Sequence, residues 1–291
     1  MTDNGVIALT GTSGALGGRI ARYLSQERVH TLLVGRNLSR IPDLSGTEKR
    51  GPAAYDEFDA MRNAVHGAST LLLISGRLSG RRFEEHVIAF DAAIAAGVER
   101  IVYVSLMGAG EHATYSNARD HWHTEQYLAQ SGVRYTILRA GVWASWLPFQ
   151  VNQTGQTDGW VIKGPGGDGR VSAVSHDDVA GVAVAVLLAD SDEHDGKIYN
   201  VTGPEALSLG EVASILSEVT GKPHRYETET LEEAIASRET VDEMPIRKEG
   251  WVTWFRALAE GDWAEVTDVV PRLTGRRAET VLEVLSRSKP D

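Results

Sequence analysis

Short apolar, β-branched runs alternate with amphipathic stretches over the first two-thirds of the chain. The apolar runs predict buried strands at Val6–Thr10, Thr31–Val34, Thr70–Ile74, Ile101–Val104 and Tyr135–Leu138. The intervening stretches carry apolar residues at helical spacing and predict helices at Phe58–Val65, Phe83–Ala96 and His121–Gln130. Near-continuous apolar strands separated by helices are typical of a parallel sheet covered on both faces. We therefore predict an α/β fold with a Rossmann-type, doubly wound parallel sheet.

This alternation breaks down after about Gly141. Trp143–Gly169 looks loop-like, with many glycines and aromatic residues, and one more strand is predicted at Lys197–Val201. A helix is predicted at Ser208–Thr220, with Ser208 as its N-cap and Glu211 completing a capping box. We therefore expect a Rossmann domain at residues 1–140 and a smaller C-terminal α/β lobe at residues 141–291, from which the chain can cross back to the sheet.

Composition removes several classes of function. The 291 residues include no cysteine, which excludes a disulfide scaffold, a thiolate nucleophile and every Cys-ligated metal site. The net charge of -11 disfavours nucleic acid as a partner. No apolar run reaches the roughly 18 residues that a membrane-spanning helix needs, and the polar start Met1–Asn4 is unlike a signal peptide. We expect a soluble, cytoplasmic protein with no nucleic-acid or membrane partner.

A glycine-rich turn lies directly between the first predicted strand and the first helix. It consists of Gly11, Thr12, Ser13, Gly14, Ala15, Leu16 and Gly17. Glycines at such a turn let the backbone approach a pyrophosphate, whose charge the helix N-terminus stabilises. The spacing is GxxGxxG rather than GxGxxG, and an ordinary strand-to-helix turn is the alternative. Its place at the start of an alternating α/β chain favours a dinucleotide-binding site.

The end of the second strand indicates which dinucleotide is bound. NAD-selective sites place an acidic residue there, about 20 residues after the glycines, to hold the ribose 2′-hydroxyl. This chain has Arg36 at that point and no acidic residue before Asp43. A guanidinium matches a 2′-phosphate in geometry and charge, and Arg40 can add to it. A solvated surface arginine is the alternative, and we predict NADPH as the cofactor.

Several catalytic motifs are missing. Typical short-chain dehydrogenases use a tyrosine with a lysine four residues later as their acid, and none of the eight tyrosines has this partner. Tyr115, with Arg119 four residues later, comes nearest. The chain also lacks a GxSxG elbow and a GxxxxGK[ST] loop, which removes support for serine hydrolysis and P-loop phosphoryl transfer.

Two further groups of side chains are candidates for the site. His121 and His123 point to different sides of a helix, so only His121 and Glu125 share a face, and we expect no metal site. A capping or cofactor-facing role suits His121 better, because ligands of open α/β sheets sit at the carboxyl ends of the strands. Trp143, Trp146 and Phe149 follow the last Rossmann strand and fit either core packing or an aromatic wall for a flat substrate.

The segment from His121 to Leu128, together with Ser131–Gly132 and Tyr135–Arg139, resembles the NmrA-like atypical short-chain dehydrogenases. Within them it is most similar to the bacterial NADPH:quinone oxidoreductases and triphenylmethane reductases. The resemblance extends over nearly the whole chain. Further matches are the glycine turn, Val34–Asn37, Leu71–Ser75, Ala95–Val98, Gly167–Arg170, Gly196–Tyr199, Ala264–Asp268 and Leu273–Arg276.

The resemblance implies a cleft between a Rossmann domain and a small lobe, with NADPH lying across it. The residues that it places along the cofactor are Gly11 to Leu16, Arg36, Ile74, Ser75, Gly76, Gly141, Val142 and Trp143. His121 matches a position that is histidine in the quinone reductases. The family usually has an acidic residue near the adenine where this chain has Ala54, directly before Tyr55, and an asparagine where it has Ala140.

Two functions stay open. The first is an NADPH-dependent reductase of quinones or similar flat, conjugated acceptors, in which hydride transfer is direct and the proton comes from solvent, His121 or Tyr115. The second is a non-catalytic NADP(H) sensor that acts through a protein partner, as some NmrA-like regulators are thought to do. A nucleotide-sugar epimerase is weakened by the missing Tyr–Lys pair. A homodimer is the default expectation for the assembly.

Overall fold

The computed structural model describes residues 5–151, 159–189, 192–239 and 245–287. The chain folds into two compact units. The first contains the chain up to Leu106, Asp120–Arg139 and Val179–Tyr199. The second contains Met107–Arg119, Ala140–Asp178 and the chain from Asn200 onward.

A seven-stranded sheet forms the centre of the first unit, in the order β3-β2-β1-β4-β5-β6-β9. The pairs from β3 through β5 are parallel. The strands are β1 (Ile7–Leu9), β2 (Thr31–Val34), β3 (Thr47–Arg50), β4 (Thr70–Ile74), β5 (Arg100–Leu106), β6 (Arg134–Ala140) and β9 (Lys197–Val201). Apart from its last strand, this is the order of a Rossmann fold, and the predicted fold class is confirmed.

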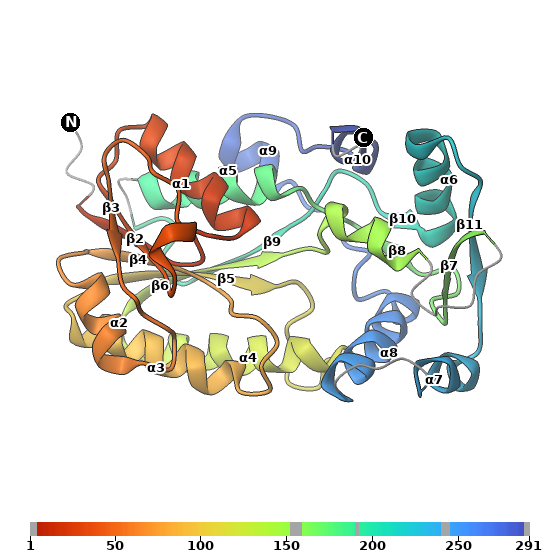
Figure 1. Ribbon diagram of the computed structural model, residues 1–291, viewed down its shortest axis with the longest axis horizontal. Helices are drawn as coiled ribbons and strands as arrows, with labels where there is room; N and C mark the ends of the chain where they lie inside the picture. The colour runs from red at the N-terminus through yellow and green to blue at the C-terminus, as the bar shows by residue number, and fades with distance from the viewer. Residues whose placement is uncertain (1–4, 152–158, 190–191, 240–244, 288–291) are drawn as a thin grey trace. The chain divides into compact units, whose positions relative to one another are not determined.

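Helices cover both faces of this sheet (Figure 1). One face carries α1 (Ala15–Gln26) and α5 (His176–Leu188), and the other carries α2 (Phe58–Val65), α3 (Arg82–Ala95) and α4 (Ser116–Gln130). The core on the second face includes Leu71, Phe90, Tyr103 and Ile137, all buried. The sheet is therefore closed to water on both faces, which explains why its strands are apolar without alternation.

The second unit contains two small sheets and several helices. In it β7 (Trp160–Gly164) pairs in parallel with β11 (His224–Thr228), and β8 (Arg170–Val171) pairs antiparallel with β10 (Leu207–Ser208). Its helical segments are η2 (Ala144–Gln150), α6 (Leu209–Thr220), α7 (Leu231–Glu239), α8 (Pro245–Glu260), α9 (Val269–Thr274) and α10 (Val281–Arg287). Within the described parts of the chain, no helix is both long and apolar enough to span a bilayer.

Two predictions of secondary structure need correction. The stretch Trp143–Gly169 is not simply a loop, because η2 and β7 lie in it, while residues 152–158 fall outside the described chain. The strand β3 was not predicted, because its sequence TEKR has no apolar residue. As the edge strand of the sheet, β3 can expose charged side chains to solvent.

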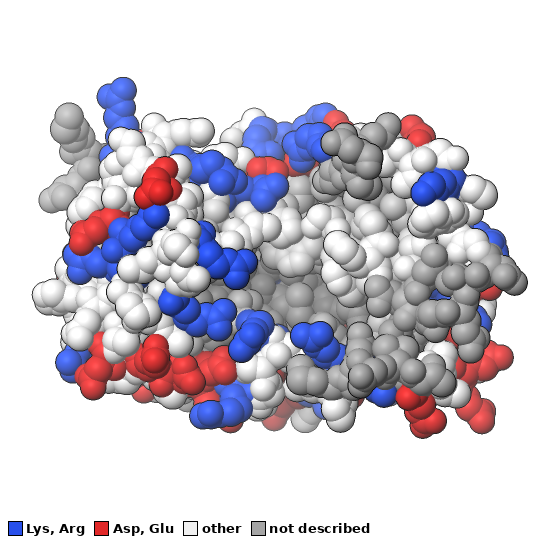
Figure 2. Space-filling view, viewed as in Figure 1, with Lys and Arg blue, Asp and Glu red and all other residues white. Residues whose placement is uncertain are grey.

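Charge is distributed unevenly over the first unit. On the face seen in Figure 2, Lys and Arg side chains gather over α1 and the neighbouring strands, and Asp and Glu gather over α2 and α3. A chain with a net charge of -11 therefore still presents a basic region on this face.

The capping box at the start of α6 gives a test of local stability. The Ser208 hydroxyl accepts a hydrogen bond from the Glu211 N–H, and the Glu211 carboxylate accepts one from the Ser208 N–H at 2.7 Å. We expect Ser208→Ala to lower the free energy of unfolding by about 1 kcal/mol. Urea titration followed by circular dichroism measures this. Ser214→Ala, on an exposed position of the same helix, is the control, and an equal loss in both variants contradicts the prediction.

Candidate functional site

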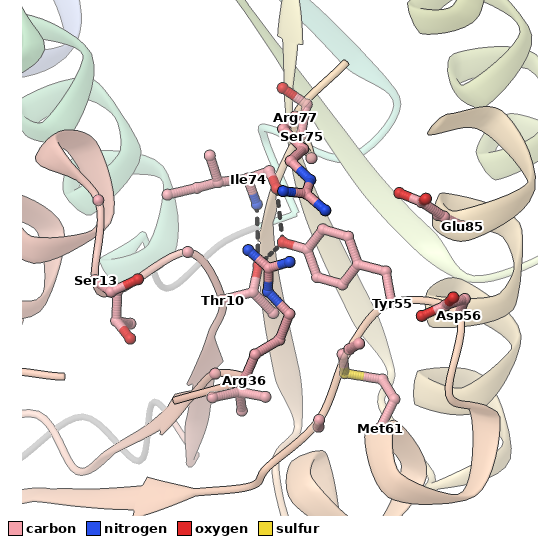
Figure 3. Close-up of a pocket in the computed structure, with 18 residues that line it drawn as sticks. Thr10, Ser13, Arg36, Tyr55, Asp56, Met61, Ile74, Ser75, Arg77 and Glu85 are labelled. Carbon is pink, nitrogen blue, oxygen red and sulfur yellow. Dashed lines mark hydrogen bonds between the residues drawn. The ribbon is translucent and has the colours of Figure 1, made fainter. Parts of the chain in front are cut away.

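A cavity of about 460 Å³ opens in the first unit at the carboxyl ends of β1, β2 and β4 (Figure 3). It is lined by four turns, each of which follows a strand of the sheet, and by residues of α2 and α3. The lining residues are Thr10, Gly11, Thr12, Ser13, Gly14, Val34, Gly35, Arg36, Ala53, Ala54, Tyr55, Asp56, Met61, Ile74, Ser75, Gly76, Arg77 and Glu85.

The cavity's position follows from the strand order. From β1 the chain moves outward to β2 and β3, and then crosses back to β4 on the other side of β1. Open α/β sheets bind their ligands at such a switch point, outside the carboxyl ends of the strands. A volume of this size is that of a small-molecule or cofactor site.

The turn from β1 to α1 brings the backbone unusually close to itself. Gly11 has a φ of +68°, and a Cβ on Gly17 would lie 2.3 Å from the Gly11 carbonyl oxygen, so a larger residue at Gly17 would force the turn open. The helix N-cap, Gly14, lines the cavity and makes no side-chain capping bond, and the first turn of α1 holds no acidic residue. An uncapped helix N-terminus of this kind suits a pyrophosphate.

Thr12 supplies a second sign that this turn fits a phosphate ligand. Its hydroxyl oxygen is buried, and no other group in the described part of the chain forms a hydrogen bond with it. A buried hydroxyl without a partner is costly, and a bound phosphate oxygen would remove that cost. Both observations show that these residues fit a dinucleotide.

Two arginines reach the cavity from the ends of different strands. Arg36 follows β2 and Arg77 follows β4, both are exposed, and Figure 3 shows their side chains directed toward Tyr55. Among the described residues neither side chain has an ion-pair partner. Arg40, which ends the short helix η1 (Leu38–Arg40), is exposed but is not part of the lining.

Tyr55 closes the floor of the cavity. Its hydroxyl oxygen lies 2.7 Å from both the Thr10 hydroxyl and the Ile74 carbonyl oxygen, and the Ile74 N–H donates to the Thr10 hydroxyl at 3.1 Å. Burial raises the pKa of Tyr55 to about 12, so the phenol stays protonated and acts as a structural hydrogen-bond donor.

The structure gathers many of the predicted cofactor residues in one place. Ala15, Leu16 and Gly17 form the first turn of α1, whereas Gly141, Val142 and Trp143 belong to the second unit. The predicted residues that line the cavity are Gly11, Thr12, Ser13, Gly14, Arg36, Ile74, Ser75 and Gly76. Ala53 to Asp56 could be placed from sequence only by the family resemblance, because they follow the unpredicted strand β3.

His121 lies in the interior of the first unit. Its Nδ1 is 2.9 Å from the Tyr103 hydroxyl, and burial holds the pKa of His121 well below its usual value, so the ring is neutral near pH 7. Its helical neighbour Glu125 is also buried and pairs with Arg139 at 2.5 Å. No cluster of three potential metal ligands exists among the described residues.

The remaining predicted site residues lie in the second unit. The Tyr115 ring packs edge-on against Trp263, and its hydroxyl accepts a hydrogen bond from Asn117 at 2.8 Å. Trp143 stacks on His176 with ring centroids 4.2 Å apart, and Trp146 packs edge-on against Trp254. Phe149 is 65% exposed. Trp143 and Trp146 therefore take part in packing, which is one of the two roles that the sequence allows them.

The fold and the cavity define a Rossmann-type nucleotide-binding protein. The chain belongs to the NAD(P)H-binding family, whose model matches residues 11–190. It is 32% identical to quinone oxidoreductase 2 of Escherichia coli over 226 residues. The aligned region covers 76% of this chain and 77% of that protein. The resemblance inferred from sequence is confirmed.

Solved structures give the same result. The Escherichia coli NADPH-dependent quinone oxidoreductase, solved with NADPH, matches with a TM-score of 0.85 and 27% identity over 97% of this chain and 99% of that chain. The Citrobacter triphenylmethane reductase, solved with NADP(H), matches with a TM-score of 0.82 and 26% identity, and the match covers 98% of this chain and 100% of that chain. The transcriptional regulator NmrA shares the fold, with a TM-score of 0.78 and 16% identity, and the match covers 97% of this chain and 94% of that chain. The relatives that are reductases support an NAD(P)H-dependent oxidoreductase, and NmrA supports the fold alone.

A histidine behind the cavity makes stability depend on pH. His86 is fully buried, and burial together with the nearby Arg82 lowers its pKa to about 3. Between pH 6.5 and 3 the unfolded chain therefore binds more protons than the folded one. This contribution to stability is complete above pH 6.5 and is lost as the pH falls toward 3.

The free energy of unfolding of the parent chain should fall between pH 7.5 and pH 5. In His86→Gln we expect this fall to be smaller, by on the order of 1–2 kcal/mol. Urea titrations at the two pH values measure the difference. His66→Gln changes an exposed histidine and should leave the parent dependence intact. Equal pH dependence in all three proteins contradicts the assignment.

Proposed function

We propose that the protein is an NADPH-dependent reductase of quinones or similar flat, conjugated acceptors. The observation that carries the proposal is the cavity at the β1/β4 switch point, where an uncapped helix N-terminus and the Arg36 guanidinium lie in one lining. The relatives described above, which act on quinones or triphenylmethane dyes, support this class of acceptor.

Each part of the cavity suits one part of the cofactor. In the proposed complex, the turn from Gly11 to Gly14 takes the pyrophosphate, with the helix dipole and backbone N–H groups opposing its charge. Arg36 takes the 2′-phosphate of the adenosine ribose, where a bidentate guanidinium is well matched. Ile74, Ser75 and Gly76 border the same space from β4.

When bound, NADPH supplies the hydride. A quinone that accepts a hydride becomes a stabilised hydroquinone anion, so the step needs no strong acid from the protein. His121 is neutral and buried, with its Nδ1 facing the Tyr103 hydroxyl, and this environment suits a packing role better than proton donation. In this proposal the protein orients the reactants and solvent supplies the proton.

The direct test follows absorbance at 340 nm with purified protein, NADPH and a panel of benzoquinones and naphthoquinones. We expect protein-dependent oxidation that saturates in quinone and is slower with NADH. If protein that binds NADPH turns over no acceptor in the panel, the reductase proposal is wrong, and the NADP(H)-sensing alternative becomes the next hypothesis to test.

Arg36→Ala tests the assignment of the 2′-phosphate. We expect NADPH to bind roughly 10- to 100-fold more weakly, because a charge-assisted hydrogen bond contributes about 1.5–3 kcal/mol, while NADH binding changes little. Calorimetric titration with each cofactor measures the ratio. Arg40→Ala removes a nearby exposed arginine that does not line the cavity and should keep the parent ratio. Equal weakening of both cofactors by Arg36→Ala would refute the assignment.

A further inference from the structure

Both backbone groups of Gly76 are held by buried side chains of one helix. The Gly76 N–H donates to Nε2 of His86 at 2.8 Å, and its carbonyl oxygen accepts from Nε of Arg82 at 3.2 Å. Both side chains come from α3, are four residues apart, and therefore lie on the same helix face. Gly76 itself lines the nucleotide cavity.

These bonds replace the sheet ladder where it ends. The Ser75 N–H still donates to Val104 of β5 at 3.3 Å, but Gly76 has left the sheet. A backbone N–H or carbonyl at such a point needs another partner if it is shielded from water. Arg82 and His86 supply one partner each, so the turn after β4 is fixed to α3 rather than to a neighbouring strand.

The hydrogen-bond pattern also determines which imidazole nitrogen of His86 carries the hydrogen. Nε2 accepts from Gly76, so the hydrogen is on Nδ1. Nδ1 lies 3.3 Å from the Thr124 hydroxyl, which donates its own hydrogen to the Asp120 carbonyl oxygen and can therefore accept. With its pKa lowered to about 3 by burial, His86 keeps this neutral form at every pH at which the protein would work.

We propose that Arg82 and His86 are positioning residues that clamp Gly76 and thereby set the affinity of the cavity for both NADPH and NADH. The inference rests on the proposed cofactor site. The clamp holds the turn Ser75–Arg77 at the cavity wall, so cofactor binding does not have to order it. Neither side chain is among the lining residues, so both act through the backbone of Gly76.

A proton relay does not account for this arrangement. The Tyr103 hydroxyl connects His86 to His121, with distances of 3.4 Å and 2.9 Å to the two Nδ1 atoms. At the cavity end, however, the series of hydrogen bonds terminates at the Gly76 amide, which does not give up its proton near neutral pH. The series can therefore hold the turn but cannot carry protons to the cavity.

Two substitutions of His86 distinguish the loss of its hydrogen-bond acceptor from a general disturbance of the core. His86→Leu removes the acceptor, whereas His86→Gln places an amide oxygen where Nε2 lies. We expect His86→Leu to raise the Kd of NADPH and of NADH by the same factor, about tenfold, because the loss of the hydrogen bond that holds the turn costs on the order of 1.4 kcal/mol. His86→Gln should restore most of the affinity. His66→Leu, at an exposed histidine, should leave both Kd values unchanged.

Amide hydrogen exchange at Gly76, measured by NMR without cofactor, tests the clamp independently of binding. We expect exchange to be slow in the parent chain and in His86→Gln, and at least tenfold faster in His86→Leu. If His86→Leu does not fold, Arg82→Met opens the clamp from the carbonyl side and should weaken both cofactors equally, with Arg82→Lys as the conservative rescue.

The outcomes distinguish this inference from the proposed function. A folded His86→Leu variant with parent Kd values overturns the clamp, and so does a His86→Gln variant that is as weak as His86→Leu. If the parent chain binds no NADPH, the proposed function fails, while the exchange rates at Gly76 still test the clamp. If His86→Leu weakens the binding of NADPH but not of NADH, the clamp is also overturned, because such selectivity indicates a contact with the 2′-phosphate.

Discussion

The end of the parallel ladder is the constraint on which the nucleotide site depends. Beyond the last residues of β1 and β4, backbone groups lose their strand partners and must find others. Thr10 and Tyr55 provide them on the floor of the cavity: the Tyr55 hydroxyl lies 2.7 Å from the Ile74 carbonyl oxygen, and the Thr10 hydroxyl accepts from the Ile74 N–H at 3.1 Å. His86 provides another at Gly76. Because side chains satisfy these groups, the sheet can open at the switch point without exposing unpaired backbone.

The same edge brings two arginines together in an acidic protein. The chain has a net charge of -11, yet Arg36 and Arg77 face the cavity without an ion-pair partner among the described residues, and Lys and Arg gather over the neighbouring strands (Figure 2). A group of Asp and Glu side chains on the same face lies over α2 and α3. Two guanidinium groups at the cavity favour the phosphates of an anionic cofactor, while the lining carboxylates Asp56 and Glu85 offset part of their charge.

Sequence patterns located the apolar parts of the fold well and the polar parts poorly. The predicted strands Thr31–Val34, Thr70–Ile74 and Lys197–Val201 have the observed bounds, and the first two are buried apolar runs with abrupt ends. The edge strand β3 and the strand β11 were missed because their sequences TEKR and HRYET are mostly polar, and β7 was missed because its short apolar run lies in a glycine-rich stretch. Because β3 was missed, only the family resemblance pointed to the segment from Ala53 to Asp56 that completes the cavity.

The sequence by itself determined the fold class, the glycine turn and the arginine at the end of β2, because these depend on local residue types and on their order along the chain. Only the tertiary structure decided which groups share one cavity. Arg77 joined the lining because strand order places β4 next to β1, whereas Arg40 lies on η1, outside the lining. It also showed that His121 is buried and neutral, and that His86 holds Gly76, because burial and hydrogen-bond partners arise only when distant segments pack together.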